Sequence, residues 1–311
     1  MTSFNRLATA NTYDNALRNI TQRQSALSGL QEHLTSGKRV VRASDDPSSA
    51  AQAERALTRM SRIVTDQRAL ASQSDAIAMA ESTLGDVTNA LQSCRELVVS
   101  AGNGTFAPKD RQTVALQLQG LRNQIVSLSN TKDTNGQALF GALGSALAPF
   151  VVPPPAAYTF DGLPGQASSS EVAIPFALDG DSAFMFDASD GATAGVTSLL
   201  QALDNAITDI GGATTSAAAA TAVSTALQDI DIGANRVSAV RGQAGELLNR
   251  ADRISTNQDK RSIQLEADRS RAEDLDMVKG IADFQNQQTG YQAALQSYAQ
   301  MQKLSLFNYI G

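Results

Sequence analysis

The chain has 311 residues, of which 42% are hydrophobic but only 5% are aromatic, and tryptophan is absent. Such a composition is typical of long helices packed at close range rather than of a thick globular core. The formal net charge of −6 and the lack of a dense basic run argue against nucleic acid as the main partner, because phosphate binding depends on clustered Lys and Arg.

Composition also limits where the protein is expected to work. A single cysteine, Cys94, excludes an intrachain disulfide. No apolar run reaches the roughly 18–20 residues that a bilayer-spanning helix needs, and the first residues lack the features of a secretory signal. Composition alone therefore predicts a cytoplasmic protein without membrane contact, although an export route without a leader peptide would escape this test.

A heptad pattern predicts a first helix over residues 5–35. Its apolar seam recurs every seven residues, at Tyr13, Ile20, Leu27 and Leu34. A second row repeats with the same step at Ala10, Leu17, Gln24 and Gln31. Two such rows form the contact seam of a coiled coil, so this helix requires a partner. Gly37 then predicts the end of the helix, because glycine adopts the left-handed conformation without steric cost.

Asp46 before Pro47 predicts the start of a second helix, with an N-cap acceptor followed by proline at the first helical position. The helical pattern continues to about Ala101. Its seam keeps a seven-residue step at Ala56, Ile63, Leu70, Ile77, Leu84, Leu91 and Val98. An uninterrupted helix of this extent is about 80 Å long and cannot bury its apolar stripe alone.

Further helices are predicted beyond this one. Pro108 and Asp110 start a helix that is expected to return antiparallel along the long helix. A helix is also expected over residues 196–210, a loop over 211–221, and a continuous helical pattern over 223–303.

Residues 141–191 differ from the rest, because they are rich in Pro, Gly, Ser and Asp. Three short strand candidates lie there: Tyr158–Phe160, Val172–Ile174 and Phe184–Phe186. The predicted fold class is therefore mainly α, a long coiled-coil helical bundle formed by the N- and C-terminal segments, with a small β-rich insert domain at the tip. The expected domains are a terminal coiled-coil assembly domain (1–45 with 265–311), a helical bundle domain (46–140 with 192–264) and the insert domain (141–191).

The C-terminal helix is unusual for a helix exposed to solvent. Between Gln285 and Gln302 it has seven glutamines and no charged residue, whereas surface helices normally carry Glu and Lys. Glutamine can be buried when it finds hydrogen-bond partners, so this helix is expected to be covered on several sides by copies of itself or close relatives. An ordinary solvated Ala/Gln-rich helix is the alternative. The lack of basic residues argues against binding to an anionic membrane.

Two motifs lie near opposite ends of the chain. The first reads Leu34-Thr35-Ser36-Gly37-Lys38-Arg39, followed by Ala43-Ser44-Asp45-Asp46-Pro47. The second reads Arg271-Ala272-Glu273-Asp274-Leu275-Asp276-Met277, followed by Phe284 and the Gln-rich helix ending in Leu304-Ser305-Leu306. Together they resemble the two terminal signatures of the bacterial flagellin superfamily. The resemblance covers about the first 140 and the last 75 residues and leaves the insert unmatched.

The resemblance implies a structural component of the bacterial flagellum, exported through the flagellar type III apparatus without a cleaved signal peptide and located outside the cell. The opening Tyr13-Asp14-Asn15-Ala16-Leu17 and the Ser48–Arg55 stretch resemble proteins at the junction of hook and filament more than flagellins. The implied partners are further copies in a ring, a neighbouring hook-associated protein, flagellin, and a cytoplasmic export chaperone that binds the C-terminal helix. A filament-forming flagellin and a cytoplasmic helical adaptor remain alternatives.

The candidate assembly interface consists of seam residues from both ends of the chain. They are Leu17, Ile20, Leu27, Leu34, Ile281, Phe284, Tyr291, Leu295, Tyr298 and Leu304. No catalytic, cofactor or metal site is expected. His33, the only histidine, is predicted to be exposed, and Cys94 falls on a seam position. The carboxylates near Asp45 and Asp274 are interpreted as features of helix starts rather than as an acid–base pair.

Overall fold

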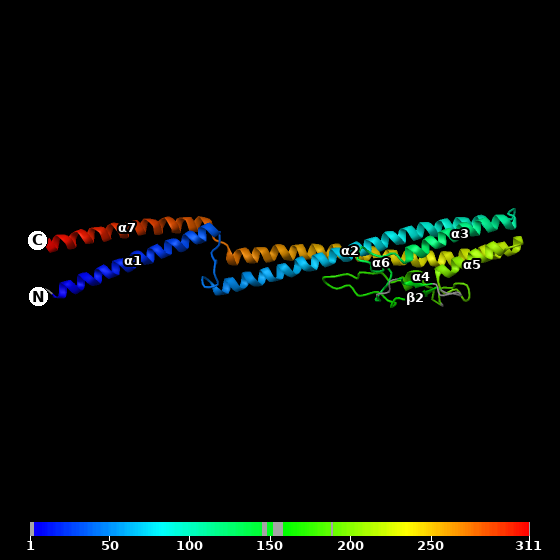
Figure 1. Ribbon diagram of the computed structural model, residues 1–311, viewed down its shortest axis with the longest axis horizontal. Coiled ribbons are helices and arrows are strands. Elements are labelled where there is room, and N and C mark those ends of the chain that lie inside the picture. The colour runs from blue at the N-terminus through cyan, green and yellow to red at the C-terminus, as the bar shows by residue number, and fades with distance from the viewer. Residues whose placement is uncertain (1–2, 145–147, 152–157, 188, 311) are drawn as a thin grey trace. The chain divides into compact units, whose positions relative to one another are not determined.

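A computed structural model describes residues 3–144, 148–151, 158–187 and 189–310. The described part of the chain is mainly helical, which confirms the predicted class (Figure 1). Its elements are α1 (Ser3–Ser36), α2 (Pro47–Ala101), α3 (Pro108–Ser129), β1 (Phe150–Val151), β2 (Thr159–Phe160), α4 (Gly180–Phe184), α5 (Leu199–Gly212), α6 (Ser216–Glu273) and α7 (Met277–Ile310).

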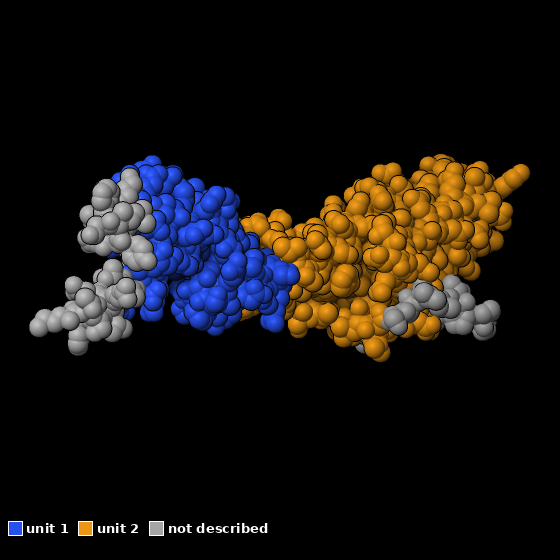
Figure 2. Space-filling model, turned by 60° about the vertical axis from the view of Figure 1, so that its left-hand side comes forward, with its two compact units in different colours: residues 1–63, 260–311 blue, residues 64–259 orange. Residues whose placement is uncertain are grey.

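The chain forms two compact units, and each of them combines segments from both halves of the sequence. Unit 1 contains residues 1–63 and 260–311, and unit 2 contains residues 64–259 (Figure 2). In unit 1, α1 packs against α7. A small apolar cluster joins Ala56 and Ile63 of α2 to Leu265 of α6 in the same unit. The three-part domain division expected from the sequence stays a prediction.

Local signals set the helix ends as expected. Gly37 follows α1 with a φ of 70°, the left-handed conformation that favours glycine. Asp46 caps α2, because its Oδ1 accepts the backbone N–H groups of Ser48 and Ser49, each at 3.1 Å. At the start of α3, the Asp110 carboxylate accepts the backbone N–H of Ala107 at 2.9 Å.

The core of unit 2 is built on the heptad seam of α2. Every predicted seam position from Ile77 to Val98 is buried. Cys94, which belongs to the second row of the same heptad pattern, is buried too. Burial raises the pKa of the Cys94 thiol to about 12, which is typical of a cysteine that packs as a small apolar residue. Across the seam lies α6, which is held antiparallel to α2 by the ion pairs Arg95–Asp231 and Arg241–Glu81.

Two shorter helices complete the bundle of unit 2. Helix α3 turns back beside α2, as predicted, and packs against α5 (Figure 1). The Arg122 guanidinium lies 2.6 Å from the Asp204 carboxylate in this α3–α5 contact. The buried Arg111 side chain donates to the Ala213 carbonyl at 3.4 Å, which ties the first turn of α3 to the end of α5.

Two expectations about the second half of the chain are corrected. Residues 216–221 are helical and belong to α6, whereas the sequence predicted a loop there. Alanine dominates this stretch and has the highest helix propensity, so the run extends the helix. The continuous helix expected over 223–303 is instead broken at residues 274–276, and Asp276 caps the new helix α7 through the N–H groups of Val278 and Lys279.

The insert is neither β-rich nor placed at a tip in its described residues. β1 and β2 pair antiparallel over only two residues each, and of the three strand candidates only Tyr158–Phe160 contains a strand. The segment lies along α2 and α6, because the Ile174 N–H donates to Gln73 Oε1 at 3.1 Å and Arg250 donates to the Ser170 carbonyl. Figure 1 shows the end of unit 2 formed by the α2–α3 and α5–α6 turns instead.

The α3 helix offers a matched test of this core. Leu118 is buried, whereas Leu116 of the same helix is 69% exposed. We expect Leu118→Ala to lower the free energy of unfolding by about 2–5 kcal/mol, because it leaves a cavity. Leu116→Ala should change it by no more than about 0.5 kcal/mol. Urea denaturation of both variants measures the difference, and equal losses would contradict the placement of α3.

Candidate assembly interface

Helices α1 and α7 lie side by side in antiparallel orientation, and three contacts set their register. The rings of Tyr13 and Tyr298 lie 5.2 Å apart between centroids, and the Tyr298 hydroxyl donates to the Tyr13 hydroxyl. Further along, Arg23 crosses α7 at Gly290, where an added Cβ would meet the guanidinium at 2.6 Å. Near the other end of the pair, Leu34 packs over Gly280.

The tyrosine contact has an electrostatic consequence. Accepting the hydrogen bond stabilises a Tyr13 phenolate and lowers its pKa, whereas donating it raises the pKa of Tyr298. The Gln302 amide lies 3.4 Å from both hydroxyls and completes the group. Both phenols are therefore used in joining the two ends of the chain.

On α1, the pairing selects one of the two predicted seam rows. A row of half-buried positions follows steps of four and three, at Ala16, Ile20, Arg23, Leu27, Leu30 and Leu34, and Gly29 and His33 beside this row are half-buried too. Leu17, in contrast, is 42% exposed, and Gln24 and Gln31 of its row are exposed as well. Tyr13 is 42% exposed as well, although its ring contacts Tyr298, so exposure alone does not decide the contact at this end of α1. Further along α1, α7 contacts the row that contains Arg23, while Gln24 and Gln31 stay exposed.

On α7, the predicted residues divide in the same way. Phe284, Tyr291 and Tyr298 are half-buried, whereas Ile281 and Leu295 are 46% and 40% exposed. The side chain of Leu304 lies outside the described residues. None of the other nine candidate residues is fully buried, so a two-helix pair leaves much of its apolar surface in contact with water.

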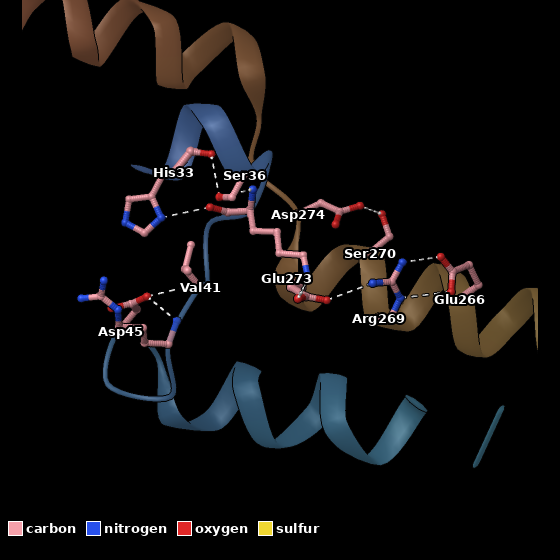
Figure 3. Close-up of polar contacts among 11 residues, drawn as sticks. His33, Ser36, Val41, Asp45, Glu266, Arg269, Ser270, Glu273 and Asp274 are labelled. Atoms are coloured by element: carbon pink, nitrogen blue, oxygen red, sulfur yellow. Dashed lines mark hydrogen bonds and ion pairs between the residues drawn. The ribbon is translucent and has the colours of Figure 1, made fainter. Parts of the chain in front are cut away.

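The non-helical segment between α1 and α2 lies next to the one between α6 and α7 in unit 1. We call residues 37–46 and 273–276 the connector. The Leu275 N–H donates to the Gly37 carbonyl at 2.9 Å, and the Arg39 N–H donates to the Glu273 carbonyl at 2.8 Å. Lys38 forms an ion pair with the Glu273 carboxylate, which also accepts from Arg269 at 3.1 Å (Figure 3). The two sequence motifs therefore lie in direct contact.

The polar residues of the connector have local structural partners. The Asp45 carboxylate accepts the N–H groups of Val41 and Arg42, and these hydrogen bonds lower its pKa (Figure 3). Hydrogen bonds from Ser49 and neighbouring groups hold the pKa of Asp46 well below its usual range. His33 is half-buried rather than exposed, and its Nδ1 lies 3.0 Å from the Lys38 carbonyl oxygen. Together these hydrogen bonds hold the turn between α1 and α2.

Sequence reasoning missed the Lys38–Glu273 ion pair, because nothing local links residues that lie 235 positions apart, and it missed the nearby His33–Lys38 contact because His33 was interpreted as an exposed helix residue. The available signal was the opposite charge of the two motifs, with Lys38 and Arg39 in the first and Glu273 and Asp274 in the second. In the described part of the chain, no helix has the length and apolar character needed to cross a bilayer, and no group of His, Cys, Asp and Glu is arranged to hold a metal ion.

Comparison with known proteins gives the same division of the chain into matched ends and a distinct middle. The family model for the bacterial flagellin N-terminal helical region matches residues 7–144, and that for the C-terminal helical region matches residues 227–310. Flagellar hook-associated protein 3 of Escherichia coli K12 is 31% identical over 317 residues, which span 97% of this chain and 98% of that protein. The chain belongs to the flagellar hook-associated protein 3 family.

Two further proteins are similar to this chain, one in sequence and one in fold. A flagellin of Bacillus subtilis is 26% identical over 87% of both chains. The crystal structure of hook-associated protein 3 from Legionella pneumophila shares the fold, with a TM-score of 0.60 and 17% identity over 69% of this chain and 97% of that chain. The family consists of structural flagellar proteins, and this member is a structural protein rather than an enzyme.

The cap of α2 gives a direct test of the connector. We expect Asp46→Ala to speed amide hydrogen exchange at Ser48 and Ser49, because both N–H groups lose their acceptor. The depressed pKa means that the charged cap is present above the usual aspartate pKa of about 3.9 and is lost only as the pH falls through the lower folded-state value. Asp46→Asn keeps an acceptor oxygen and should change exchange less. Equal exchange rates in wild type and Asp46→Ala would contradict this role.

Proposed function

We propose that this protein forms the junction between the flagellar hook and filament, where its copies assemble into a ring through helices α1 and α7. The observation that carries the proposal is the incompletely buried α1–α7 pair in a chain similar over its whole length to a hook-associated protein 3. Its partners are further copies of itself, a neighbouring hook-associated protein on one side and flagellin on the other. Its place of work is the flagellum outside the cell.

The energetic argument rests on the side chains that the pair leaves exposed. Leu17, Ile281 and Leu295 lose contact with water only if another helix covers them. Each fully buried Leu or Ile contributes about 1.5–3 kcal/mol. A few such side chains per subunit, repeated around a ring, are enough to hold a mechanical joint together.

The same exposed stripe supports the proposal that an export chaperone binds α7. Residues 285–302 of α7 carry no charge, and α1 is the helix that packs against α7 in unit 1. An uncharged amphipathic helix of this kind is prone to premature association. A cytoplasmic partner that covers α7 until export prevents such association.

Filament-forming flagellin is the second candidate function, and the similarity to the Bacillus subtilis flagellin favours it. Short filament seeds added to purified protein separate the two roles. Extensive elongation of the seeds supports the flagellin role, whereas failure to elongate supports the junction role.

Deletion of the gene tests the junction role in the cell. We expect complete hooks without filaments, and flagellin lost into the medium, because filament subunits then have no surface on which to assemble. Electron microscopy of the cells and immunoblotting of the medium measure both outcomes. Normal filaments in the deletion strain would contradict the junction role.

Single substitutions test the assembly surface. We expect Leu27→Asp and Leu295→Asp to abolish ring assembly and motility, because each places a charge where a neighbouring helix packs. Unit 2 should stay folded, since neither residue belongs to it. Leu27→Met and Leu295→Met are the matched controls and should assemble, because methionine keeps the apolar volume. Motility assays and circular dichroism measure the two effects, and motile Asp variants would overturn the assignment.

A further inference from the structure

Unit 1 contains a groove that the α1–α7 pair does not explain. It lies between the first turns of α2 and the last turns of α6 and has a volume of about 360 Å³. Its walls include Gln52, Arg55 and Arg59 from α2, and Leu265, Asp268 and Arg271 from α6. Such a space accommodates a few side chains but no folded domain.

The arginines of the groove are not balanced within the chain. Arg271 is neutralised by Asp268, with 2.6 Å between guanidinium and carboxylate. Arg55 and Arg59 stand one helical turn apart, are exposed, and form no ion pair among the residues that the structure describes. Like charges at this spacing repel each other, so an anionic group between them is stabilising. Arg62 continues the same helix face and extends the positive charge.

The rest of the chain supplies the opposite charge. Unit 1 has 15 Lys and Arg against 11 Asp and Glu, a formal net charge of +4. Unit 2 has 10 Lys and Arg against 20 Asp and Glu, a formal net charge of −10. Along α2 within unit 2, the carboxylates of Asp75, Asp86 and Glu96 are exposed and form no ion pair among the described residues.

We propose that the arginine groove of one copy binds carboxylates on the α2 surface of unit 2 in a neighbouring copy. The partner is a second copy of this chain, because the charge of unit 2 is complementary to the groove and because copies stand next to one another in the proposed ring. The inference rests on the proposed function to that extent. Arginine is suited to this contact, since its planar fork binds a carboxylate through two parallel hydrogen bonds.

The groove also selects the shape of what it binds. The buried side chains of Ala56 and Leu265 also line the groove and give it an apolar floor, and the Ser49 hydroxyl in its lining donates to Asp46. A carboxylate side chain that enters between Arg55 and Arg59 can rest its methylene group on this floor. Charge pairs that are partly shielded from water in this way contribute more than fully exposed pairs.

Site-specific photo-crosslinking in assembled flagella tests the proposal. Gln52 is exposed in the groove wall and can be replaced by the photoreactive p-benzoyl-L-phenylalanine. After irradiation of sheared flagella, we expect a species of twice the chain mass whose cross-linked peptides come from residues 64–259. Peptides from another protein, peptides only from residues 1–63 or 260–311, or no cross-linked dimer would each overturn the proposal.

Charge reversal provides the second measurement. Arg55→Glu combined with Arg59→Glu should lower the yield of that dimer at least about tenfold, as expected when charged partners across an interface become repulsive. Lys109→Glu combined with Lys132→Glu is the matched control, because it changes the net charge equally but on unit 2 and outside the groove. An unchanged yield in the groove variant, or an equal loss in the control, would contradict the groove assignment.

The two proposals fail in different ways. If the gene deletion leaves hooks without filaments but the groove cross-links elsewhere, the junction role stands and the groove assignment is wrong. If the deletion strain has normal filaments while the groove forms the expected dimer, the copies associate as proposed but the junction role is wrong.

Discussion

An apolar stripe that a single helix cannot cover is the constraint on which this molecule depends. In unit 2, the stripe of α2 is covered by α6, with α3 and α5 filling the remaining sides, and the seam from Ile77 to Val98 is fully buried. In unit 1, α1 and α7 pack against each other, and none of their described seam residues is fully buried. The same heptad pattern thus produces a self-sufficient bundle in one unit and an incomplete one in the other.

The connector makes this arrangement possible within one chain. The helices that follow these two segments, α2 and α7, begin in the same way. Asp46 and Asp276 each cap the following helix by accepting two backbone N–H groups at 3.1 Å. Backbone hydrogen bonds from Leu275 to Gly37 and from Arg39 to Glu273 then join the two segments. Backbone groups freed by ending a helix are satisfied by the opposite segment, which removes the cost of leaving them without partners.

Membership in the flagellar hook-associated protein 3 family gives these features a common purpose. In the proposed ring, each copy needs surfaces that are incomplete in the single chain. The exposed stripes of α1 and α7 supply apolar surface, and the arginine groove supplies unbalanced positive charge. Apolar burial is non-directional, whereas paired charges define which surfaces meet, so the two kinds of surface complement each other in an assembly.

Much of this architecture was readable from residue order, because helix periodicity and capping are local properties. The seven-residue steps, the helix end at Gly37 and the start at Pro47 were all predicted correctly. The alanine-rich start of α6 was missed because a run of Gly, Ala, Thr and Ser was interpreted as a loop, although helix propensity favours its alanines. The insert was predicted to be β-rich, since short apolar runs between turn residues look alike in strands and in packed loops.

Tertiary structure alone decided which surfaces face a partner. The row through Arg23 and the row through Leu17 and Gln24 both repeat every seven residues beside Ile20. Only the position of α7 determines that the Arg23 row faces it, while Leu17 and Gln24 stay exposed. The net charge of −6 follows from composition, but its division into +4 and −10 required knowing which distant segments form each unit. Periodicity and capping act within a few residues, whereas the facing row and the charge of a surface depend on segments more than two hundred residues apart.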